Sequence, residues 1–579
     1  MVRPNLLRRL VCLVVVTLVV ACQGPQPASL APMAAERVVS RPPIRAAAGM
    51  VVSADMRASQ VGRDVLRAGG NAIDAAIATG FALAVTHPGA GNIGGGGFMV
   101  VRLPDGRATA IDFREKAPLA ANADMFLDEN GTYSSTLHHN SHLAVGVPGT
   151  VAGFAKAHER YGKLPWARLV GPAVDLAAEG FVLTGNLARS LRGVVQRLSR
   201  YPATVDAFTR DGEEYLPGEV LRQPDLARTL ERIMREGRKG FYRGETARLL
   251  AAEMRRGGGL ITEEDLARYE AIERTPIRGT FRGYEIISMP PPSSGGPALV
   301  QMLNVLEGYD LRSMGHNSAA YIHHVTEAMR RAYRDRALLL ADQDFVEVPV
   351  DRLTSKEYAA ELRQSINPAM AGHSDPADVS VPHESDQTTH YSVVDADGMA
   401  VSVTYTLEQG YGSGIVVPGA GFLLNNEMGD FNPQRGLTTS GGLIGTEPNL
   451  ARPEQRMLSS MTPTILARDG RLVAVIGSPG GRTIINTVLQ VALNVMEFDM
   501  GIQEAVDARR LHHQWLPDNL RIEAGGVSAE TVGQLRAMGH VVQVRGRQGS
   551  IHSIMIDPVT GDRLGAPDYR QSDAGAAGH

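Results

Sequence analysis

The stretch QTTHYSVVDADGMAVSVTYTLE, residues 387–408, decides the fold of this chain. Polar and apolar residues alternate through 391–394 and again through 401–404, and the turn-forming segment 395–398 lies between them. Alternation with period two on both sides of such a turn is typical of a β-hairpin. We therefore expect a strand that opens with Thr388 and a partner strand that returns alongside it.

Turn geometry decides which residue lies opposite the first threonine. If Val394 pairs with Met399, this threonine falls opposite Tyr405. A one-residue bulge at Gly398 instead places it opposite Thr406. In either register the Thr406 hydroxyl lies within about one residue of the first threonine, where it can hydrogen-bond a nucleophile.

Two threonines at the start of a strand are usually only good strand formers, but the segment before them is unusual. Residues 366–387 are polar, contain three prolines and show almost no apolar periodicity, so they predict a loop long enough to need a functional explanation. A threonine hydroxyl becomes a nucleophile when a base takes its proton, and a newly freed α-amine on the same residue can be that base. A mobile segment that is cut immediately before Thr388 would free this amine.

Composition excludes several classes of protein. The 579 residues carry 58 basic and 62 acidic side chains, a formal charge of −4, with no basic block that would indicate a nucleic-acid binder. Hydrophobic residues at 43% and charged residues at 21% are globular values. Glycine is abundant, with 63 residues, which predicts many tight turns.

The N-terminus is typical of an export signal. Three arginines precede an apolar run at 10–20, which is shorter than the roughly 20 residues of a permanent membrane span. The run ends in Val-Val-Ala-Cys22, which resembles a bacterial lipobox and predicts a signal peptide at 1–21 and lipidation of Cys22. Residues 22–48 are rich in proline and alanine and predict a tether. We expect an exported periplasmic or cell-envelope lipoprotein, with plain secretion as the alternative.

Several sequence patterns that resemble known binding or catalytic motifs lack the context or spacing that those sites need. Residues 89–94 read GAGNIG, but a predicted helix precedes them and a strand follows, the reverse of the dinucleotide-binding order. Histidines at 138–142, 323–324 and 512–513 lack the carboxylate spacing of a zinc motif. Both cysteines, Cys12 and Cys22, precede the main body, so no thiol nucleophile or thiolate metal site is expected there. We expect neither a metal nor a cofactor.

Three further segments have clear local patterns. Residues 50–85 predict mostly helix, with apolar side chains at helical spacing behind a possible cap at Asn71. Residues 98–101 and 472–476 predict strands. A glycine-rich turn at 477–481 and a helix that begins near Thr483 follow the second strand.

The chain resembles the γ-glutamyltranspeptidase (glutathione hydrolase proenzyme) family from about residue 48 to 570. The longest close match is GGNAIDAAIATGFALAVTHPGAGNIGGGGFMV at 69–100. Further matches, in the family's order, are DFRE at 112–115, PPPSSGG at 290–296, QTTHYSVVD at 387–395, LLNNEMGDF at 423–431, LSSMTPT at 458–464 and GSPGG at 477–481. Seven ordered motifs make chance agreement negligible.

The resemblance implies an α+β fold, the four-layer αββα sandwich of an N-terminal-nucleophile hydrolase, built from large and small subunits after self-cleavage. It implies cleavage between Gln387 and Thr388, which gives a large subunit at 49–387 after the tether and a small subunit at 388–579. The two subunits would remain together as a heterodimer. The implied substrates are small γ-glutamyl compounds such as glutathione, with water, amino acids or peptides as acceptors, and membrane contact only through the lipid anchor.

The resemblance also assigns roles to site residues, and the chemistry of a γ-glutamyl group explains them. Its α-carboxylate needs a cation and hydroxyls, its α-ammonium needs anions, and its tetrahedral oxyanion needs backbone N–H donors. The implied catalytic residues are Thr388, Thr406, Gly480 and Gly481; the implied substrate-binding residues are Arg114, Glu408, Glu427, Asp430, Ser459 and Ser460.

Two departures from the family pattern leave alternatives open. Glu408 stands where many members have asparagine, and the loop after Asp430, through 441–442, lacks the aromatic residue that covers the site in some members. One alternative therefore keeps the nucleophile but changes the acyl group, as in glutaryl (cephalosporin) acylases or polyglutamate transpeptidases. A more remote alternative is a non-catalytic binding lipoprotein that stays a single chain.

Overall fold

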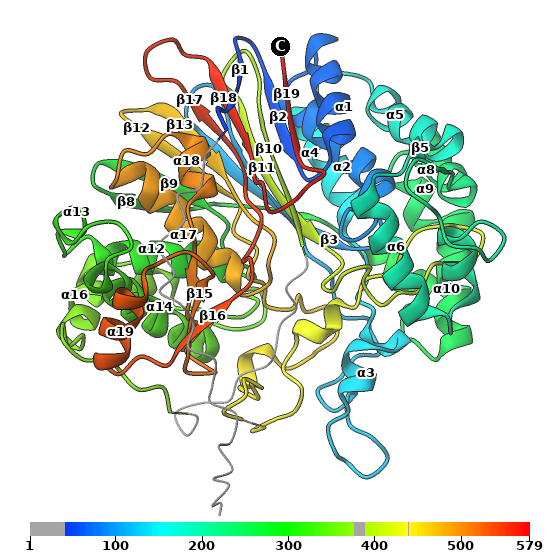
Figure 1. Cartoon of the computed structure of the whole chain (residues 1–579). Helices are drawn as coiled ribbons and strands as arrows, with labels where there is room; N and C mark the ends of the chain where they lie inside the picture. Colours follow the sequence, from blue (N-terminus) through cyan, green and yellow to red (C-terminus); the bar gives the residue numbers. More distant parts are fainter. Residues whose placement is uncertain (1–40, 376–387, 438) are drawn as a thin grey trace, which may run out of the picture.

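The computed structural model describes residues 41–375, 388–437 and 439–579. Within these residues, two seven-stranded sheets, antiparallel throughout, lie between two groups of helices (Figure 1). The first sheet has the order β19 (Gly575–Gly578), β2 (Met50–Ser53), β10 (Thr389–Val394), β11 (Ala400–Thr406), β3 (Gly96–Arg102), β4 (Ala108–Phe113) and β7 (Ile272–Arg274). The second has the order β1 (Ile44–Ala46), β18 (Arg563–Pro567), β17 (His552–Ile556), β13 (Arg471–Ile476), β12 (Thr464–Arg468), β9 (Tyr284–Ser288) and β8 (Ile277–Phe281).

The first sheet is covered by a different layer on each of its two faces. Successive side chains of a strand point to opposite faces and therefore enter different cores. In β3, Met99 and Val101 belong to the hydrophobic core under the first group of helices. Phe98 and Val100 belong to the core that is shared with the second sheet. All of β3 is buried, as in a strand covered on both faces.

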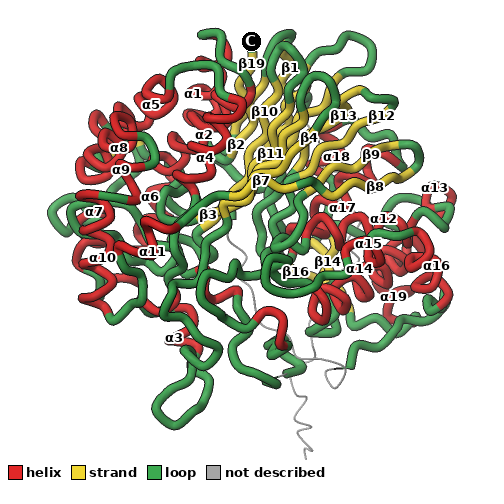
Figure 2. Tube along the Cα trace, turned by 180° about the vertical axis from the view of Figure 1, so that it is seen from behind, coloured by secondary structure: helices red, strands yellow, loops and turns green. Residues whose placement is uncertain are grey.

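The first group of helices covers the outer face of the first sheet, and Figure 2 shows it from behind. Its main members are α1 (Met56–Arg67), α2 (Ala72–Thr86), α4 (Thr150–Tyr161), α5 (Trp166–Glu179), α6 (Gly185–Leu198), α8 (Pro224–Glu236) and α10 (Gly244–Gly257). Every residue of α2 is buried, and Asn71 caps it in a reciprocal capping box with Asp74. The predicted cap is confirmed, whereas the predicted helical stretch begins with a strand, β2.

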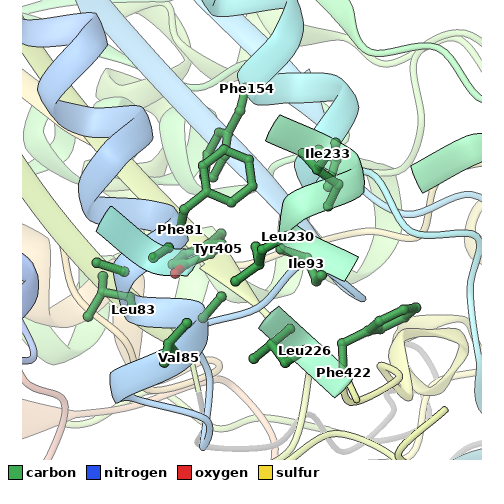
Figure 3. Close-up of a cluster of buried hydrophobic side chains, with 14 of the residues drawn as sticks. Phe81, Leu83, Val85, Ile93, Phe154, Leu226, Leu230, Ile233, Tyr405 and Phe422 are labelled. Atoms are coloured by element: carbon green, nitrogen blue, oxygen red, sulfur yellow. The ribbon is translucent and has the colours of Figure 1, made fainter. Parts of the chain in front are cut away.

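Aromatic and aliphatic side chains join this layer to the hairpin (Figure 3). Phe81 of α2 meets Phe154 of α4 edge-on, with ring centroids 5.2 Å apart. Phe154 also lies 6.2 Å from the ring of Tyr405 in β11. The Tyr405 hydroxyl donates to the carbonyl of Gly80 at 3.0 Å. The strand that carries Thr406 is thereby anchored to the most buried helix of the layer.

The second group of helices covers the second sheet. Its members are α12 (Gly295–Leu306), α14 (Ala319–Leu339), α16 (Lys356–Gln364), α17 (Thr483–Met496), α18 (Ile502–Asp507) and α19 (Ala529–Ala537). A small three-stranded sheet, β14 (Leu511–His512), β15 (Leu520–Glu523) and β16 (Val542–Arg545), lies on this side. The remaining elements are α3 (Ser135–His139), α7 (Pro202–Phe208), α9 (Lys239–Tyr242), α11 (Glu263–Arg268), α13 (Leu311–Met314), α15 (Val350–Leu353), β5 (Phe181–Val182) and β6 (Val220–Leu221).

Both sheets combine strands from either side of residue 388. In the first sheet β2 lies between β19 and β10, and in the second sheet β1 flanks β18. The expected αββα layering is confirmed. The order at the glycine cluster is also confirmed, because α2 ends at Thr86 and β3 begins at Gly96. No helix in the described part of the chain is long and apolar enough to cross a membrane.

Candidate active site

The hairpin brings two threonine hydroxyls together at the start of β10. Thr389 pairs with Tyr405 and Val394 with Ala400, so Thr388, one residue earlier, reaches Thr406. Their Oγ1 atoms lie 3.4 Å apart. The direct register, with Val394 opposite Met399, is therefore wrong, and the bulged register is confirmed. The extra residue is accommodated at Gly398, whose φ of +85° suits glycine.

Thr406 is held from its other side by Glu408. The Glu408 backbone N–H donates to the Thr406 hydroxyl oxygen at 2.9 Å. Glu408 has a φ of +78°, a left-handed conformation that is uncommon for a residue with a side chain. Such conformations persist where the surroundings over-determine them, which is typical of functional sites.

The residues assigned to the site by resemblance line one small cavity beside Thr388, which encloses about 20 Å³. Its lining comprises Arg114, Thr388, Thr406, Glu408, Glu427, Asp430, Ser459, Ser460, Met461, Gly481 and Ile484. Of the predicted residues that the structure describes, only Gly480 lies outside this lining, and it borders a neighbouring cavity together with Thr388. The sequence motifs therefore converge in space, although they are separated by more than 300 positions.

Arg114 is the cation of this cavity and is completely buried after the end of β4. Its Nη1 donates to Glu427 at 2.7 Å, and its Nη2 donates to Asp430. The backbone N–H of Arg114 donates to Asp112 at 3.0 Å, and Asp112 in turn accepts from Arg274 at 2.8 Å. Both ends of the arginine are therefore fixed, as planar recognition of a carboxylate requires.

Acidic groups outnumber the cation in this region. Burial opposes the charge on Arg114, but the carboxylates of Glu427, Asp430 and Glu115 outweigh burial and raise the pKa of the guanidinium. Burial raises the pKa of Glu115 to about 8 and that of Glu427 well above its ordinary value, despite the nearby arginine. A ligand ammonium beside these acids would favour their ionised forms.

His139, which has no sequence signal of function, lies next to the acidic side of the cavity. Its Nδ1 lies 3.7 Å from the Glu408 carboxylate. Burial lowers the pKa of His139, but Glu408 outweighs this effect and raises it above the ordinary value. The adjacent His138 is close to the carbonyl of Met428 at 3.2 Å, which ties the α3 loop to the 3₁₀ turn η3 (Glu427–Asp430).

Ser459 and Ser460 are supported from behind by the PPPSSGG segment. Ser294 donates to the Ser459 carbonyl through its backbone N–H at 2.7 Å and its hydroxyl at 2.6 Å. Arg336, a buried residue of α14, donates to the Ser460 hydroxyl at 3.0 Å and to the Ser294 hydroxyl at 2.8 Å. Sequence reasoning missed Arg336 because an arginine within a helix has no local signal of function.

Gly480 and Gly481 form the predicted turn between β13 and α17. Both are buried, and no described residue accepts a hydrogen bond from either backbone N–H. Buried N–H groups without a partner are rare, so this pair is suited to an anionic oxygen. The φ values of +129° and +52° require glycine, and a Cβ on Gly480 would lie 2.5 Å from the Thr483 hydroxyl.

A cluster that could hold a metal was also missed, because His540 is remote in sequence from its partners. Ligand atoms of His323, Glu327 and His540 lie within 4.8 Å of one another. Glu327, however, already accepts from Arg331 at 2.7 Å, and the two imidazoles approach each other at 2.9 Å. Protein groups thus satisfy this cluster, which is also separate from the Thr388 cavity.

Three predictions lie outside the described residues: the signal peptide with Cys22, most of the tether, and the cleavage partner Gln387. The described residues bring together a threonine hydroxyl, a cation flanked by acids, two serine hydroxyls and two free N–H groups. This combination can bind a zwitterionic acyl group and stabilise a tetrahedral oxyanion formed at its carbonyl.

Comparison with known proteins agrees with this chemistry. A sequence profile described as Gamma-glutamyltranspeptidase matches residues 58–578. The chain is 48% identical over 540 residues to a glutathione hydrolase proenzyme of Escherichia coli (strain K12), with 93% of both proteins covered.

Two solved structures share the architecture. Cephalosporin acylase from Bacillus halodurans superposes with a TM-score of 0.83 and 29% identity, over 96% of this chain and 99% of that chain. A γ-glutamyltranspeptidase chain from Helicobacter pylori superposes with a TM-score of 0.54 and 47% identity, over 55% of this chain and 91% of that chain.

Proposed function

This chain belongs to the γ-glutamyltranspeptidase family, and we propose that it is a self-processing γ-glutamyl hydrolase and transferase with Thr388 as its nucleophile. Glutathione and its conjugates are the proposed substrates, in line with the glutathione hydrolase proenzyme to which the chain is 48% identical. The observation that carries the proposal is the 3.4 Å approach of the Thr388 and Thr406 hydroxyls within the cavity that holds Arg114.

Maturation would use the same hydroxyl. The Thr388 oxygen adds to the carbonyl carbon of Gln387, the peptide C–N bond breaks, and the hydroxyl proton passes to the departing nitrogen. Water then hydrolyses the resulting ester, which leaves a carboxylate on Gln387 and a free α-amine on Thr388. The proposed products are a large subunit that ends at residue 387 and a small subunit, 388–579.

The γ-glutamyl group would bind by replacing the ion pairs that Arg114 makes with acidic side chains. Its α-carboxylate takes the place of acidic side chains on Arg114, assisted by the Ser459 and Ser460 hydroxyls. Its α-ammonium takes the freed carboxylates of Glu427 and Asp430. Because the cavity encloses only about 20 Å³, roughly the space of one or two water molecules, this exchange must widen it.

Catalysis would follow in two steps, the formation and the breakdown of a γ-glutamyl ester of Thr388. The α-amine of Thr388 takes the hydroxyl proton while the oxygen attacks the γ-carbonyl carbon, and the Gly480 and Gly481 N–H groups bind the oxyanion. The C–N bond then breaks, and the leaving amine takes that proton. Water or an acceptor amine attacks the ester and regenerates Thr388 with glutamate or a new γ-glutamyl amide.

Glu408 helps to determine which of the alternative acyl groups the cavity favours. A glutaryl group carries no α-ammonium, so it would leave the acids Glu408, Glu427 and Asp430 without a ligand cation. Burying such an excess of negative charge is unfavourable. The 29% identical cephalosporin acylase keeps this alternative open, but the acid-rich cavity favours a γ-glutamyl substrate.

We also propose export through residues 1–21 and anchoring through lipidated Cys22, followed by the tether at 22–48. This proposal rests on the arginines, the short apolar run and the lipobox-like ending. Metabolic labelling with a fatty acid, compared between the native chain and a Cys22→Ala variant, tests it directly. Secretion without label in both proteins would contradict the anchor.

Intact mass and N-terminal sequencing, with a Thr388→Ala variant as control, test the proposed nucleophile. Two chains, with the smaller beginning Thr-Thr-His, and an uncut variant would support it. A single uncut chain in both preparations would remove the required amine and favour the non-catalytic alternative. Rates on γ-glutamyl and glutaryl anilides then separate the acyl groups, and faster glutaryl release would overturn the proposed substrate.

A further inference from the structure

His139 faces Glu408 beside the small cavity, and the surrounding backbone fixes this arrangement. The Nδ1 atom of His139 lies 3.7 Å from Oε1 of Glu408, and the histidine side chain is 14% exposed. The His139 carbonyl accepts the side-chain N–H of Asn426 at 3.1 Å. The amide oxygen of Asn426 in turn accepts the backbone N–H of Gln409, the residue after Glu408, at 3.1 Å. Asn426 therefore holds together the two segments that carry the pair.

A glycine makes room for the imidazole between Glu408 and the 3₁₀ turn η3. A Cβ on Gly429 would lie 2.4 Å from Nδ1 of His139 and 3.5 Å from the Glu408 carboxyl carbon. The imidazole and the carboxylate therefore meet over the backbone of Gly429, and a larger residue at this position would displace the imidazole. The pair depends on the packing of α3, η3 and the loop after β11 against one another.

Other charged and titratable groups surround the pair. They are Tyr133 before α3, His138 on α3, Arg197 and Arg200 on α6, Glu427 and Asp430 on η3, and Arg114 and Glu115 after β4. The arginines keep their charge. Burial lowers the pKa of His138 well below its ordinary value, and burial with Glu408 raises that of Tyr133 to about 12, so neither changes charge near neutral pH. The raised pKa values of Glu115 and Glu427 mean that a test must separate their titration from that of His139.

A substrate ammonium and a protonated His139 would compete for one carboxylate. Glu408 lines the cavity proposed for the acyl group, on the side of the acids that would receive the α-ammonium. Burial lowers the pKa of His139, but Glu408 and Asp430 outweigh this effect and raise it. A second cation beside Glu408 repels the imidazolium and lowers this pKa again. A bound ammonium would therefore release the His139 proton to solvent, whereas a glutaryl group, which has hydrogen in place of the ammonium, would not.

We propose that His139 is a specificity-determining residue, and that its charge sets which acyl group the cavity prefers. Protonated His139 neutralises Glu408 and favours an acyl group without an ammonium, such as glutaryl. Neutral His139 no longer competes with the α-ammonium of a γ-glutamyl group for Glu408. The inference rests on the proposed γ-glutamyl chemistry at Thr388, and His139 is not among the residues to which the family resemblance assigns a role.

A selectivity ratio measured between pH 5.5 and 8 tests the proposal. The ratio is kcat/KM on a γ-glutamyl anilide divided by kcat/KM on the matching glutaryl anilide. Over this range it should rise about three- to tenfold more in the native protein than in a His139→Gln variant, as for partly exposed charge pairs. The ratio rises with pH because the His139 proton opposes the ammonium at low pH and is lost at high pH. Titration of the Thr388 amine affects both substrates alike and cancels in the ratio.

Two variants of fixed charge set the limits of the native behaviour. His139→Lys carries a cation throughout this pH range and should give a low ratio, whereas His139→Gln carries none and should give a high one. The native ratio should move from the lysine value toward the glutamine value as the pH rises. Titration of Glu115 and Glu427 is common to all three proteins, so the differences between them report His139.

The neighbouring histidine is the matched control. The His138 imidazole contacts the Tyr133 hydroxyl at 3.1 Å and the Met428 carbonyl at 3.2 Å, and it stays neutral over this pH range. His138→Gln should therefore keep the native pH dependence of the ratio. In a Glu408→Gln background, by contrast, the substitutions of His139 should no longer change that dependence, because the carboxylate for which the two cations compete is gone.

Inhibition constants provide the same comparison without turnover. L-Glutamate and glutarate differ by the same ammonium group, so the ratio of their inhibition constants should follow the same pH dependence in each variant. This measurement replaces the anilide ratio where glutaryl release is too slow to measure.

The outcomes separate this inference from the proposed function. If the native protein hydrolyses no γ-glutamyl anilide, the γ-glutamyl chemistry is wrong and the inference falls with it. If it does, and the native, His139→Lys and His139→Gln proteins share one ratio at each pH, the role of His139 is wrong and the chemistry stands. Conversion into two chains on a denaturing gel and equal midpoints of thermal unfolding verify that the substitutions leave folding intact.

Discussion

The hydroxyl oxygens of Thr388 and Thr406 lie 3.4 Å apart, one position before the first pair of the β10–β11 ladder, Thr389 with Tyr405. The same Thr406 oxygen accepts the Glu408 backbone N–H at 2.9 Å. Thr406 therefore has one fixed partner in the loop and one in the proposed nucleophile. Its hydroxyl therefore lies where it can orient Thr388, and the residue that donates to it from the loop, Glu408, has a left-handed backbone.

Removal of the Thr406 hydroxyl should slow both self-cleavage and turnover. We expect Thr406→Val, which keeps the branched shape, to lower kcat by about ten- to a hundredfold, because the orientation of the nucleophile is lost. Thr406→Ser keeps the hydroxyl and should stay close to the native rate. Time courses of chain cleavage and steady-state rates on a γ-glutamyl anilide measure the two effects. Equal activity of the valine and serine variants would contradict this role.

Neutralising Glu408 should weaken recognition of the substrate ammonium. For Glu408→Gln we expect kcat/KM on a γ-glutamyl anilide to fall about tenfold, because one carboxylate near the α-ammonium is lost. The rate on the matching glutaryl anilide should hold or rise, because that substrate has no ammonium. The ratio of the two rates is the measurement. A parallel loss on both substrates would mean that Glu408 acts only through the loop backbone.

Arg336 should act as a positioning residue for Ser460. Arg336→Lys loses the two-pronged contact with the Ser294 and Ser460 hydroxyls, and we expect KM to rise about fivefold with kcat little changed. Ser460→Ala should give a similar rise. Because both changes disrupt one contact, the double variant should resemble either single variant. Independent multiplication of the two effects would show that Arg336 supports the site by another route.

The buried acid Glu115 should make stability depend on pH. Its pKa is raised from 4.5 to about 8, mainly by burial, so the folded chain holds this proton more tightly than the unfolded chain. Stability contributed by the bound proton is present below pH 4.5 and falls as the pH rises toward 8, by up to about 1.4 kcal/mol per unit. Glu115→Gln does not titrate and should lack this loss.

Urea unfolding at pH 5.5 and 8.5 measures this effect. The uncut Thr388→Ala chain is the suitable background, because its unfolding involves one molecule. The native Glu115 chain should lose more stability between the two pH values than the glutamine variant does. Superimposable pH dependences would mean that Glu115 is ionised throughout, neutralised by Arg114 at 3.5 Å.

Much of the architecture could be predicted from local pattern. The hairpin, the Asn71 cap, the turn at 477–481 and the helix after it follow from periodicity and turn chemistry, which depend on adjacent residues. The local pattern does not choose between the two registers of the hairpin. The structure decides it through the five-residue turn, in which the Asp395 carboxylate accepts the backbone N–H of Met399 at 2.9 Å.

The surroundings of the site could be predicted less well from the sequence. Arg336 and His139 lie on helices whose local sequences are typical of solvated surface. Their contribution to the site depends on which distant segment packs against them, and a single sequence does not show which segments pack together. The motif residues around Arg114 were found only because the family pattern supplied their mutual arrangement.

The interleaving of strands gives self-cleavage a lasting consequence. β2 comes from before residue 388 but pairs with β10 and β19, which come from after it. A cut at this point would leave the ladders intact, yet would turn refolding from a first-order event of one chain into an encounter of two. The mature form would then depend for its lifetime on a slow rate of unfolding, and heat or denaturant would inactivate it irreversibly in dilute solution.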